Sequence, residues 1–189
     1  RGILKRSMSK DIIIHTDGGS RGNPGPGGAG FTLADASGGE LLGRGVFLGQ
    51  TTNNIAEYTA VREALKAAAA MGAESIRLYS DSELLVRQLN GQYKVKSDNL
   101  KALYAECVEL LSGFARRQVT HVRREQNKRA DALANEAMDK QTDVAYGNAE
   151  PQPKGNRLRL GVLLSGGGRT MLNLQEKIDA GRLNAEIVL

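Results

Sequence analysis

The sequence has few of the residues that build cross-links or aromatic-rich cores. Its 189 residues include one cysteine and no tryptophan, and aromatic residues make up 4% of the chain. A single cysteine excludes a disulfide framework within the chain. Cys107 falls in the helical pattern LYAECVELL, where a small buried residue is the expected role. Because disulfides are typical of oxidising compartments, this cysteine usage favours a cytoplasmic protein.

Long apolar runs are also missing. No segment approaches the roughly 18 apolar residues that a membrane-spanning helix needs, and no signal-peptide pattern is present. We therefore expect a soluble protein that acts away from membranes. The chain does not begin with methionine, and we expect residues 1–7 to be a non-native or disordered lead.

Histidine is scarce too, since His15 and His121 are the only two in the chain. Both fall in strand patterns, so we expect structural roles for them and no zinc site. Charge is plentiful by contrast, with 26 Lys and Arg against 21 Asp and Glu and a formal net charge of +5. This balance favours a polyanionic partner such as nucleic acid, and a mixed basic surface is the alternative.

Hydrophobic periodicity and turn residues predict the element order β-β-β-α-β-α-α-β-α. The first strand contains three isoleucines from Ile12 to Ile14 and leads into a glycine-rich loop over Gly18–Gly30. Two further strands complete an antiparallel meander, and Ser80 with Glu83 forms an S-x-x-E capping box that opens a later helix. The order predicts an α/β fold, in which a five-stranded mixed sheet has three antiparallel strands, then parallel strands, and helices on its faces.

Composition divides the chain into a main domain at residues 8–141, a linker at 142–156 and a C-terminal piece at 157–189. The linker assignment depends on AEPQPKGN, which mixes proline, glycine and polar residues. The C-terminal piece predicts a strand, a glycine loop, a helix and the start of a second strand. This is the opening of one β-α-β unit.

Glu57 lies at an unusual place for a charge. In the helix predicted over residues 53–72, it heads an apolar stripe made of Ala60, Val61, Ala64, Leu65 and Ala68. An unpaired carboxylate is costly to bury, so Glu57 should lie at an exposed edge of this face or meet a cation. The alternative is a simple favourable interaction with the helix dipole.

Three further acids repeat this kind of position. Asp17 and Asp81 each end a predicted strand, and Asp131 comes early in the helix predicted over residues 128–140. Each is ambiguous alone, because acids are common in turns and at helix starts. In an open α/β sheet, however, such ends converge on one crevice. Converging carboxylates repel one another unless divalent ions neutralise them, so together the acids predict a site for two Mg²⁺ or Mn²⁺ ions that could cleave a phosphodiester.

Four motifs surround these acids. They are TDGGSRGNPGPGGAG, TTNNIAEYTAV, YSDSELLVRQLNG and QNKRADALAN. Through them, the region from about Lys10 to Lys140 resembles type 1 ribonuclease H in the order and spacing of its motifs. The resemblance implies a ribonuclease H-like fold with Asp17, Glu57, Asp81 and Asp131 as catalytic acids and metal ligands. It also implies two-metal hydrolysis of the RNA strand of RNA·DNA hybrids, with 5′-phosphate and 3′-hydroxyl products, in which Glu57 and Asp81 help to orient the attacking water.

The same resemblance implies contacts to nucleic acid. The glycines that begin at Gly18 would let the backbone approach the RNA minor groove, where the 2′-hydroxyl distinguishes RNA from DNA. Asn23 and Asn54 would contact the hybrid, while Thr52 and Asn53 would help to hold the DNA phosphate. The alternative for these residues is ordinary turn chemistry.

Two departures from the family pattern stand out. The segment HVRREQNKRAD has no histidine where many bacterial members carry a loop histidine proposed to assist product release, and Arg123, Arg124 or Glu125 is a candidate replacement. The segment LNGQYKVKSDNL is also shorter than the basic helix with which some members hold substrate. It has only Lys94 and Lys96 as basic residues, so hybrid affinity is either weaker or supplied by other basic residues such as Arg21, Arg44 and Arg129.

The C-terminal piece resembles something different, the first strand, glycine loop and helix of a glycinamide ribonucleotide formyltransferase. The resemblance is carried by VLLSGGGRTMLNLQEKIDAG, in which SGGG would suit a phosphate at a helix N-terminus. It includes no catalytic part of that family, so we expect no formyl transfer.

The leading hypothesis is therefore a metal-dependent nuclease that acts on RNA·DNA hybrids as a monomer. One alternative is a non-catalytic hybrid-binding module on the same fold, which the presence of all four acids disfavours. Another is a different nuclease of this fold, such as a transposase-like or junction-cutting enzyme, which the glycine segment and TTNN disfavour.

Overall fold

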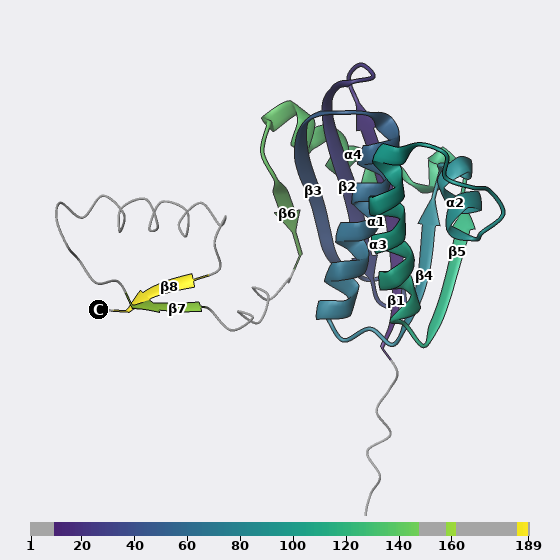
Figure 1. Ribbon diagram of the computed structural model, residues 1–189. Helices are drawn as coiled ribbons and strands as arrows, with labels where there is room; N and C mark the ends of the chain where they lie inside the picture. Colours follow the sequence, from purple (N-terminus) through teal and green to yellow (C-terminus); the bar gives the residue numbers. More distant parts are fainter. Residues whose placement is uncertain (1–9, 148–157, 162–184, 189) are drawn as a thin grey trace, which may run out of the picture. The chain divides into compact units, whose positions relative to one another are not determined.

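Figure 1 shows the computed structural model, which describes residues 10–147, 158–161 and 185–188. The chain divides into two compact units, Arg1–Ala149 and Glu150–Leu189, and each is described by itself. The predicted lead, most of the predicted linker and most of the C-terminal piece lie outside the described residues. The boundaries expected for those segments therefore stay predictions.

The first unit is built on one mixed sheet. Its strands are β1 (Asp11–Ser20), β2 (Gly25–Ala34), β3 (Glu40–Thr51), β4 (Ser75–Ser80), β5 (Arg116–His121) and β6 (Val144–Tyr146). They lie in the order β5-β4-β1-β2-β3-β6. β2 pairs antiparallel with both β1 and β3, whereas β4 pairs parallel with both β1 and β5. The predicted α/β class and the change from antiparallel to parallel strands are confirmed.

β6 was not predicted from the sequence. It pairs antiparallel with β3 and makes a six-stranded sheet where five strands were expected, and it lies inside the range 142–156 that composition assigns to a linker. Three residues are too few for an alternating pattern to stand out. The strand depends instead on partners far away in the sequence. For example, the backbone N–H of Phe47 donates a hydrogen bond to Asp143 Oδ1 at 2.9 Å, just before β6.

Helices cover both faces of this sheet. Those in the described part of the unit are α1 (Asn53–Ala70), α2 (Glu83–Leu89), α3 (Asp98–Ser112) and α4 (Lys128–Lys140), and a 3-10 turn, η1 (Arg124–Gln126), precedes α4. α1 packs on one face with α3 against it, while α4 packs on the other face (Figure 1). No helix within the described ranges is both long and apolar enough to cross a membrane.

The core between the sheet and α1 is apolar. The stripe predicted after Glu57 is confirmed, because all five of its residues are buried. It packs against side chains from β1 and β2, namely Ile12, Ile14, Phe31 and Leu33. Cys107 of α3 is buried in the same core, as its helical pattern predicted.

The glycine-rich segment after Ile14 is strand for most of its length, so the predicted loop over Gly18–Gly30 was wrong. β1 continues to Ser20 and β2 begins at Gly25, which leaves only a short turn between them. Glycine usually weakens a strand, and for that reason the pattern suggested a loop. Here Gly18, Gly28 and Gly30 are required by the close approach of helices, a contact that the local sequence does not reveal.

These close approaches occur on both faces of the sheet. A Cβ atom on Gly18 would lie 2.3 Å from the backbone of Ala56 and Glu57 in α1. A Cβ atom on Gly30 would lie 2.1 Å from the carbonyl oxygen of Ala130 in α4. Real Cβ atoms do not come so near to backbone atoms, so these two positions need glycine for α1 and α4 to reach their observed distance from the sheet.

In the second unit the structure describes two short strands, β7 (Leu158–Gly161) and β8 (Ala185–Val188), which pair in parallel. The glycine loop and helix that the sequence predicts between them lie outside the described residues. The resemblance of this piece to a formyltransferase therefore stays a prediction.

Candidate active site

Asp17 and Glu57 are brought together by a glycine contact. Asp17 lies within β1, three positions before the strand ends, rather than at the strand end as predicted. The next residue, Gly18, touches the backbone of α1 at Glu57 itself. The absence of a side chain at Gly18 therefore lets the first turns of α1 lie directly over β1, with Glu57 beside Asp17.

Asp81 reaches the same place through strand register. Thr16 of β1 pairs with Ser80 of the parallel strand β4, so Asp17 and Asp81 are the next residues along two neighbouring strands. The sequence predicted Ser80 as the N-cap of the next helix, and this was wrong. The helix α2 begins at Glu83, and its N-cap is Ser82, two residues later. Ser82 Oγ donates a hydrogen bond to Glu57 Oε2 at 2.6 Å and so links the cap of α2 to the acid on α1.

Asp131 comes from the opposite face of the sheet. Gly30 pairs with Asp17 across the β1–β2 ladder, and the carbonyl of Ala130 packs on Gly30. The residue after Ala130 is Asp131, which is therefore delivered next to Asp17. Asn135 Nδ2 donates to the Asp131 carbonyl at 3.0 Å within α4.

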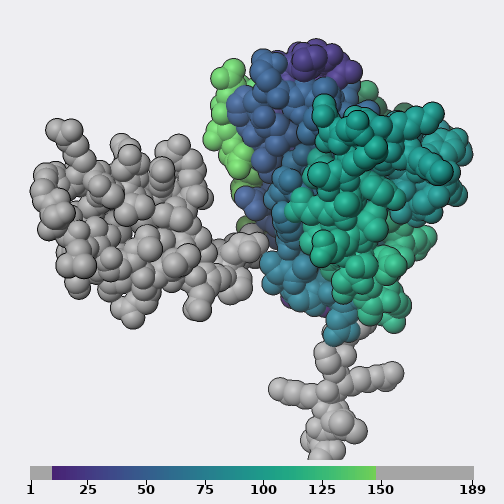
Figure 2. Space-filling view, viewed as in Figure 1, coloured from purple at the N-terminus to yellow at the C-terminus, as the bar shows by residue number. Residues whose placement is uncertain are grey.

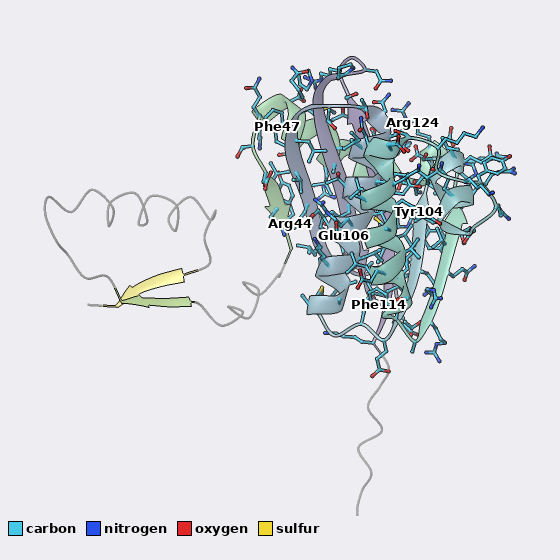
Figure 3. The ribbon with its side chains drawn as sticks, in the orientation of Figure 1. Arg44, Phe47, Tyr104, Glu106, Phe114 and Arg124 are labelled. Carbon is cyan, nitrogen blue, oxygen red and sulfur yellow. The ribbon has the colours of Figure 1, made fainter. Side chains whose placement is uncertain are left out.

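All four predicted acids line one cleft of about 340 Å³, at the end of the sheet where β1 and β4 have their carboxyl ends. Gly18 and Asn53 line it as well, together with Arg124. Figure 3 places Arg124 at this end of the unit and Phe114 at the other. Figure 2 shows the β1–β2 turn, in purple, exposed at the same end. The four acids come from four separate elements, and only the fold brings them together.

The cleft holds four acidic side chains, and the positive charge around them does not balance theirs. Burial, followed by repulsion from Asp81 and Asp131, raises the pKa of Asp17 to about 7. Burial also raises the pKa of Glu57, and the hydrogen bond from Ser82 partly opposes this rise. The cation that pairs with this group is Arg124, whose Nη2 donates to Asp131 Oδ1 at 3.1 Å. Because the Arg124 side chain is 76% exposed, its attraction is weakened by solvent.

The donor atoms suit a hard divalent cation, since all of them are carboxylate oxygens. In the described residues, however, no three His, Cys, Asp or Glu side chains are arranged as a ready-made ion site. Repulsion from Asp81 and Asp131 nevertheless adds to the effect of burial on the pKa of Asp17, so these three carboxylates lie near one another. The chemistry of the site therefore fits Mg²⁺ or Mn²⁺, and the side chains would have to close around such an ion.

The predicted nucleic-acid contacts divide between two places. Asn23, Thr52 and Asn54 line a second hollow, of about 220 Å³, whose other polar residues include Ser97 and Asn99. Sequence reasoning missed these last two, because Ser97 and Asn99 flank the start of α3, where small polar residues are common. Thr52 also caps α1, with its Oγ1 accepting a hydrogen bond from Ile55 N at 3.4 Å.

Asn53 lies in the acid cleft instead, where it holds the end of β1. Its Oδ1 accepts hydrogen bonds from Ser20 N at 2.7 Å and from Ser20 Oγ at 3.0 Å. Since Ser20 precedes the β1–β2 turn and Asn53 begins α1, these bonds fix the turn relative to the helix that carries Glu57.

Two of the basic residues considered as hybrid contacts are engaged in ion pairs. Arg21 pairs with Asp139, and Arg129 donates to both carboxylate oxygens of Glu40 at 3.2 Å. Lys94 and Lys96 are exposed between α2 and α3. All four residues are exposed, and the two arginines differ from the lysines in these ion pairs.

Asn127 is the residue near the acids that sequence reasoning missed altogether. It is 1% exposed, and its Nδ2 donates to Asp81 Oδ1 at 2.8 Å. An asparagine just before a helix is normally taken as an N-cap, and that signal conceals the contact with Asp81.

Comparison with known proteins gives a consistent result. Residues 15–137 match the family described as Reverse transcriptase-like. Ribonuclease HI of Halobacterium salinarum is 46% identical over 137 residues, which cover 72% of this chain and 69% of that protein. Its crystal structure superimposes with a TM-score of 0.67 and covers 69% of this chain and 98% of the solved one.

Two other relatives extend this result. A bifunctional protein of Mycobacterium tuberculosis is 40% identical over 74% of this chain, but the match spans only 39% of that longer protein. The crystal structure of LC11-RNase H1 in complex with an RNA/DNA hybrid is 42% identical, with a TM-score of 0.65, over 69% of this chain and 98% of that one.

Proposed function

The chain belongs to the ribonuclease HI family and is a ribonuclease H, and on that basis we propose that it hydrolyses the RNA strand of RNA·DNA hybrids with two divalent ions held by Asp17, Glu57, Asp81 and Asp131. A similar protein, LC11-RNase H1, is solved with such a hybrid. We propose 5′-phosphate and 3′-hydroxyl products and a monomeric enzyme. A cytoplasmic location stays a prediction from cysteine usage.

One observation carries the proposal, namely the convergence of four carboxylates from β1, α1, α4 and the end of β4 in a single cleft. Burial in this cleft, followed by repulsion from Asp81 and Asp131, raises the pKa of Asp17 to about 7, so the cleft favours added positive charge. Mg²⁺ or Mn²⁺ would supply that charge and stabilise both the attacking and the leaving oxygen of the phosphodiester.

The protein's own contacts orient the acids for this task. Ser82 donates to Glu57 Oε2 and so orients the carboxylate, and we propose that Glu57 Oε1 accepts a hydrogen bond from the attacking water. Asn127 donates to Asp81 Oδ1 and leaves Asp81 Oδ2 as its other oxygen ligand. These fixed carboxylates would hold the water and the scissile phosphate at a constant distance, which is the main contribution of positioning to rate.

The second hollow supports recognition of the nucleic acid. Its amides and hydroxyls, from Asn23, Thr52 and Asn54 with Ser97 and Asn99, are donors that suit phosphate oxygens. The bonds between Ser20 and Asn53 tie the β1–β2 turn to α1 beside it. One strand of a hybrid could then be held in this hollow while the RNA strand lies at the acids, where its 2′-hydroxyl distinguishes it from DNA.

A non-catalytic hybrid-binding module is the second candidate. The exposed lysines and the polar hollow would serve it equally well. It does not explain why four acids share a cleft that destabilises the charged forms of Asp17 and Glu57, because a binding module gains nothing from that cost.

The test uses an end-labelled RNA strand annealed to DNA, with RNA duplex and DNA duplex as controls. Wild type, Asp17→Asn and Glu109→Gln are each incubated with Mg²⁺, with Mn²⁺ or with a chelator. Glu109→Gln makes the same change from carboxylate to amide at an exposed position on α3. We expect cleavage of the hybrid alone, with metal alone, by wild type and Glu109→Gln, and a loss of at least about 100-fold in Asp17→Asn.

Product ends are checked by ligation and by phosphatase treatment. Cleavage by purified Asp17→Asn at the wild-type rate would disprove the four-acid mechanism. Hybrid binding by wild type without any cleavage would favour the binding module.

A further inference from the structure

Asn127 is a buried asparagine at the start of a helix that it does not cap. It is the residue between η1 and α4, and no hydrogen bond joins its side chain to the first turn of α4. Asparagine in this position usually accepts a bond from the helix backbone, and that contact is worth about 1 kcal/mol. The side chain is instead turned toward the end of the sheet and is only 1% exposed.

In that orientation Asn127 joins the elements that carry three of the four acids. Its Nδ2 donates to Asp81 Oδ1 at 2.8 Å and to the carbonyl oxygen of Thr16 at 2.9 Å. Thr16 is the residue directly before Asp17. The backbone carbonyl of Asn127 accepts a hydrogen bond from Asp131 N at 3.1 Å. One residue thus links the end of β4, the strand β1 and the first turn of α4.

The two acceptors also determine which way the amide faces. The Thr16 carbonyl and the Asp81 carboxylate can only accept, so the NH₂ group must face them and Oδ1 must face away. On that other side Asn127 and His15 line one cavity of about 290 Å³. Asn127 Oδ1 and His15 Nδ1 are both buried, and neither has a hydrogen-bond partner in the described residues.

His15 is well placed to complete this arrangement. It precedes Asp17 by two residues on β1, so both side chains point to the α4 face of the sheet. Its ring stacks on Tyr79 of β4, with centroids 5.1 Å apart, and this contact fixes the plane of the imidazole. A neutral imidazole has one N–H donor, and a buried donor without a partner is costly, as is a buried amide oxygen.

We infer that Asn127 is a positioning residue that orients Asp81 against β1, and that His15 Nδ1–H donates to Asn127 Oδ1 and holds the amide in this orientation. The inference concerns the same site and rests on the proposed function. Without the amide, Asp81 would lose its only side-chain donor in the described structure and could rotate away from Asp17. Substitution of a residue that holds a metal ligand in place typically lowers metal affinity or activity by about 10- to 100-fold.

The experiment compares Asn127→Ala and the isosteric Asn127→Asp with a matched control, Asn90→Ala. Asn90 Nδ2 also donates to a strand carbonyl, that of Val119 at 3.1 Å, but Asn90 lies outside the acid cleft. For each variant, Mn²⁺ affinity is measured by calorimetry without nucleic acid, kcat and KM are measured on the hybrid, and the melting temperature is recorded.

We expect Asn127→Ala to lower Mn²⁺ affinity and kcat by about 10- to 100-fold at unchanged KM for the hybrid. Asn127→Asp should lower kcat at least as much, because a carboxylate facing Asp81 adds repulsion instead of a donor. A purely structural role would lower the melting temperature of Asn127→Ala yet leave kcat and Mn²⁺ affinity at the level of Asn90→Ala, and that result would overturn the inference.

The part of His15 is tested by a double-mutant cycle with His15→Phe, which keeps a ring to stack on Tyr79. His15→Phe alone should weaken Mn²⁺ binding in the same direction, by a smaller factor, and it should add nothing in the Asn127→Ala background. Additive effects would show that His15 does not act through Asn127.

This design separates the inference from the proposed function. If wild type binds Mn²⁺ but cleaves no hybrid, the proposed function fails, while the calorimetric comparison of Asn127→Ala with Asn90→Ala still decides the inference. If wild type cleaves the hybrid and the two variants behave alike in both assays, the inference fails alone.

Discussion

The two faces of the main sheet are packed in different ways. On the α1 face, large apolar side chains such as Phe31 and Leu33 meet an alanine-rich helix, and no buried charge intervenes among the residues of that core cluster. On the α4 face, Gly28 and Gly30 bring backbone against backbone, and polar groups such as His15 and Asn127 are buried beside them.

This difference suggests that the α1 face mainly stabilises the fold, whereas the α4 face mainly positions the acids. Burial of large side chains supplies most of the free energy of folding and tolerates small shifts. A contact between a glycine and a helix backbone contributes little buried area but fixes the distance between two elements. On the α4 face, Asp131 is fixed by the contact of α4 with Gly30, and Asp81 is held by Asn127, so this face should control activity more than stability.

The largest effect on stability should come from the α1 face. Leu65 is fully buried on α1. Leu65→Ala should cost about 3 kcal/mol of unfolding free energy, from lost burial and the cavity left behind. Because Leu65 lies two turns beyond Glu57, kcat of the folded protein should stay close to wild type. Denaturant unfolding and hybrid cleavage at low temperature measure the two quantities, and a large fall in kcat with little loss of stability would break the comparison.

The complementary change is Gly30→Ala on the α4 face. The new Cβ atom would lie 2.1 Å from the Ala130 carbonyl and push α4 away, with Asp131 on it. Overpacking of this kind costs about 1 to 3 kcal/mol. We expect kcat to fall by more than this loss of stability explains. Gly19→Ala is the control for stability, because a Cβ there meets no atom within 4 Å.

The acid cleft itself should make the metal-free protein pH-sensitive. The pKa of Asp17 is about 7 in the folded protein and near its ordinary value of 3.8 when unfolded. A raised folded pKa stabilises the protein at low pH, and this contribution is lost as pH rises from about 4 to about 7.

Because solvent screens part of this effect, it should amount to about 1 to 2 kcal/mol. With a chelator present, Asp17→Asn should therefore be more stable than wild type at pH 8 and similar at pH 4. Urea unfolding across this range measures the effect, and parallel pH profiles for the two proteins would contradict it.

The smallest effect on stability is expected for Arg124, which lines the acid cleft. Arg124 pairs with Asp131, but its side chain is 76% exposed. Exposed ion pairs contribute little to stability. Arg124→Ala should therefore leave the melting temperature within about 2 °C of wild type in a thermal scan. A larger fall in melting temperature would show that the ion pair between Arg124 and Asp131 contributes to stability, and it would weaken the distinction between the two faces.

Much of this molecule could be predicted from local patterns. The order of helices and strands, the buried stripe on α1 and the burial of Cys107 follow from periodicities that extend over a few turns or strand residues. The predictions failed where a residue's role depends on a distant partner. The glycine-rich stretch of β1 and β2 looked like a loop because α1 and α4, which require Gly18, Gly28 and Gly30, are far along the chain.

The sequence by itself singled out Asp17, Glu57, Asp81 and Asp131 and placed Glu57 and Asp131 near helix starts, because helix starts have local signals. Only the tertiary structure decided that Asp17 lies within a strand, that its pKa rises to about 7 and that Asn127 joins three elements at once. The physical reason is that desolvation, repulsion and hydrogen bonding depend on distances across the fold, between residues that are tens of positions apart in the chain.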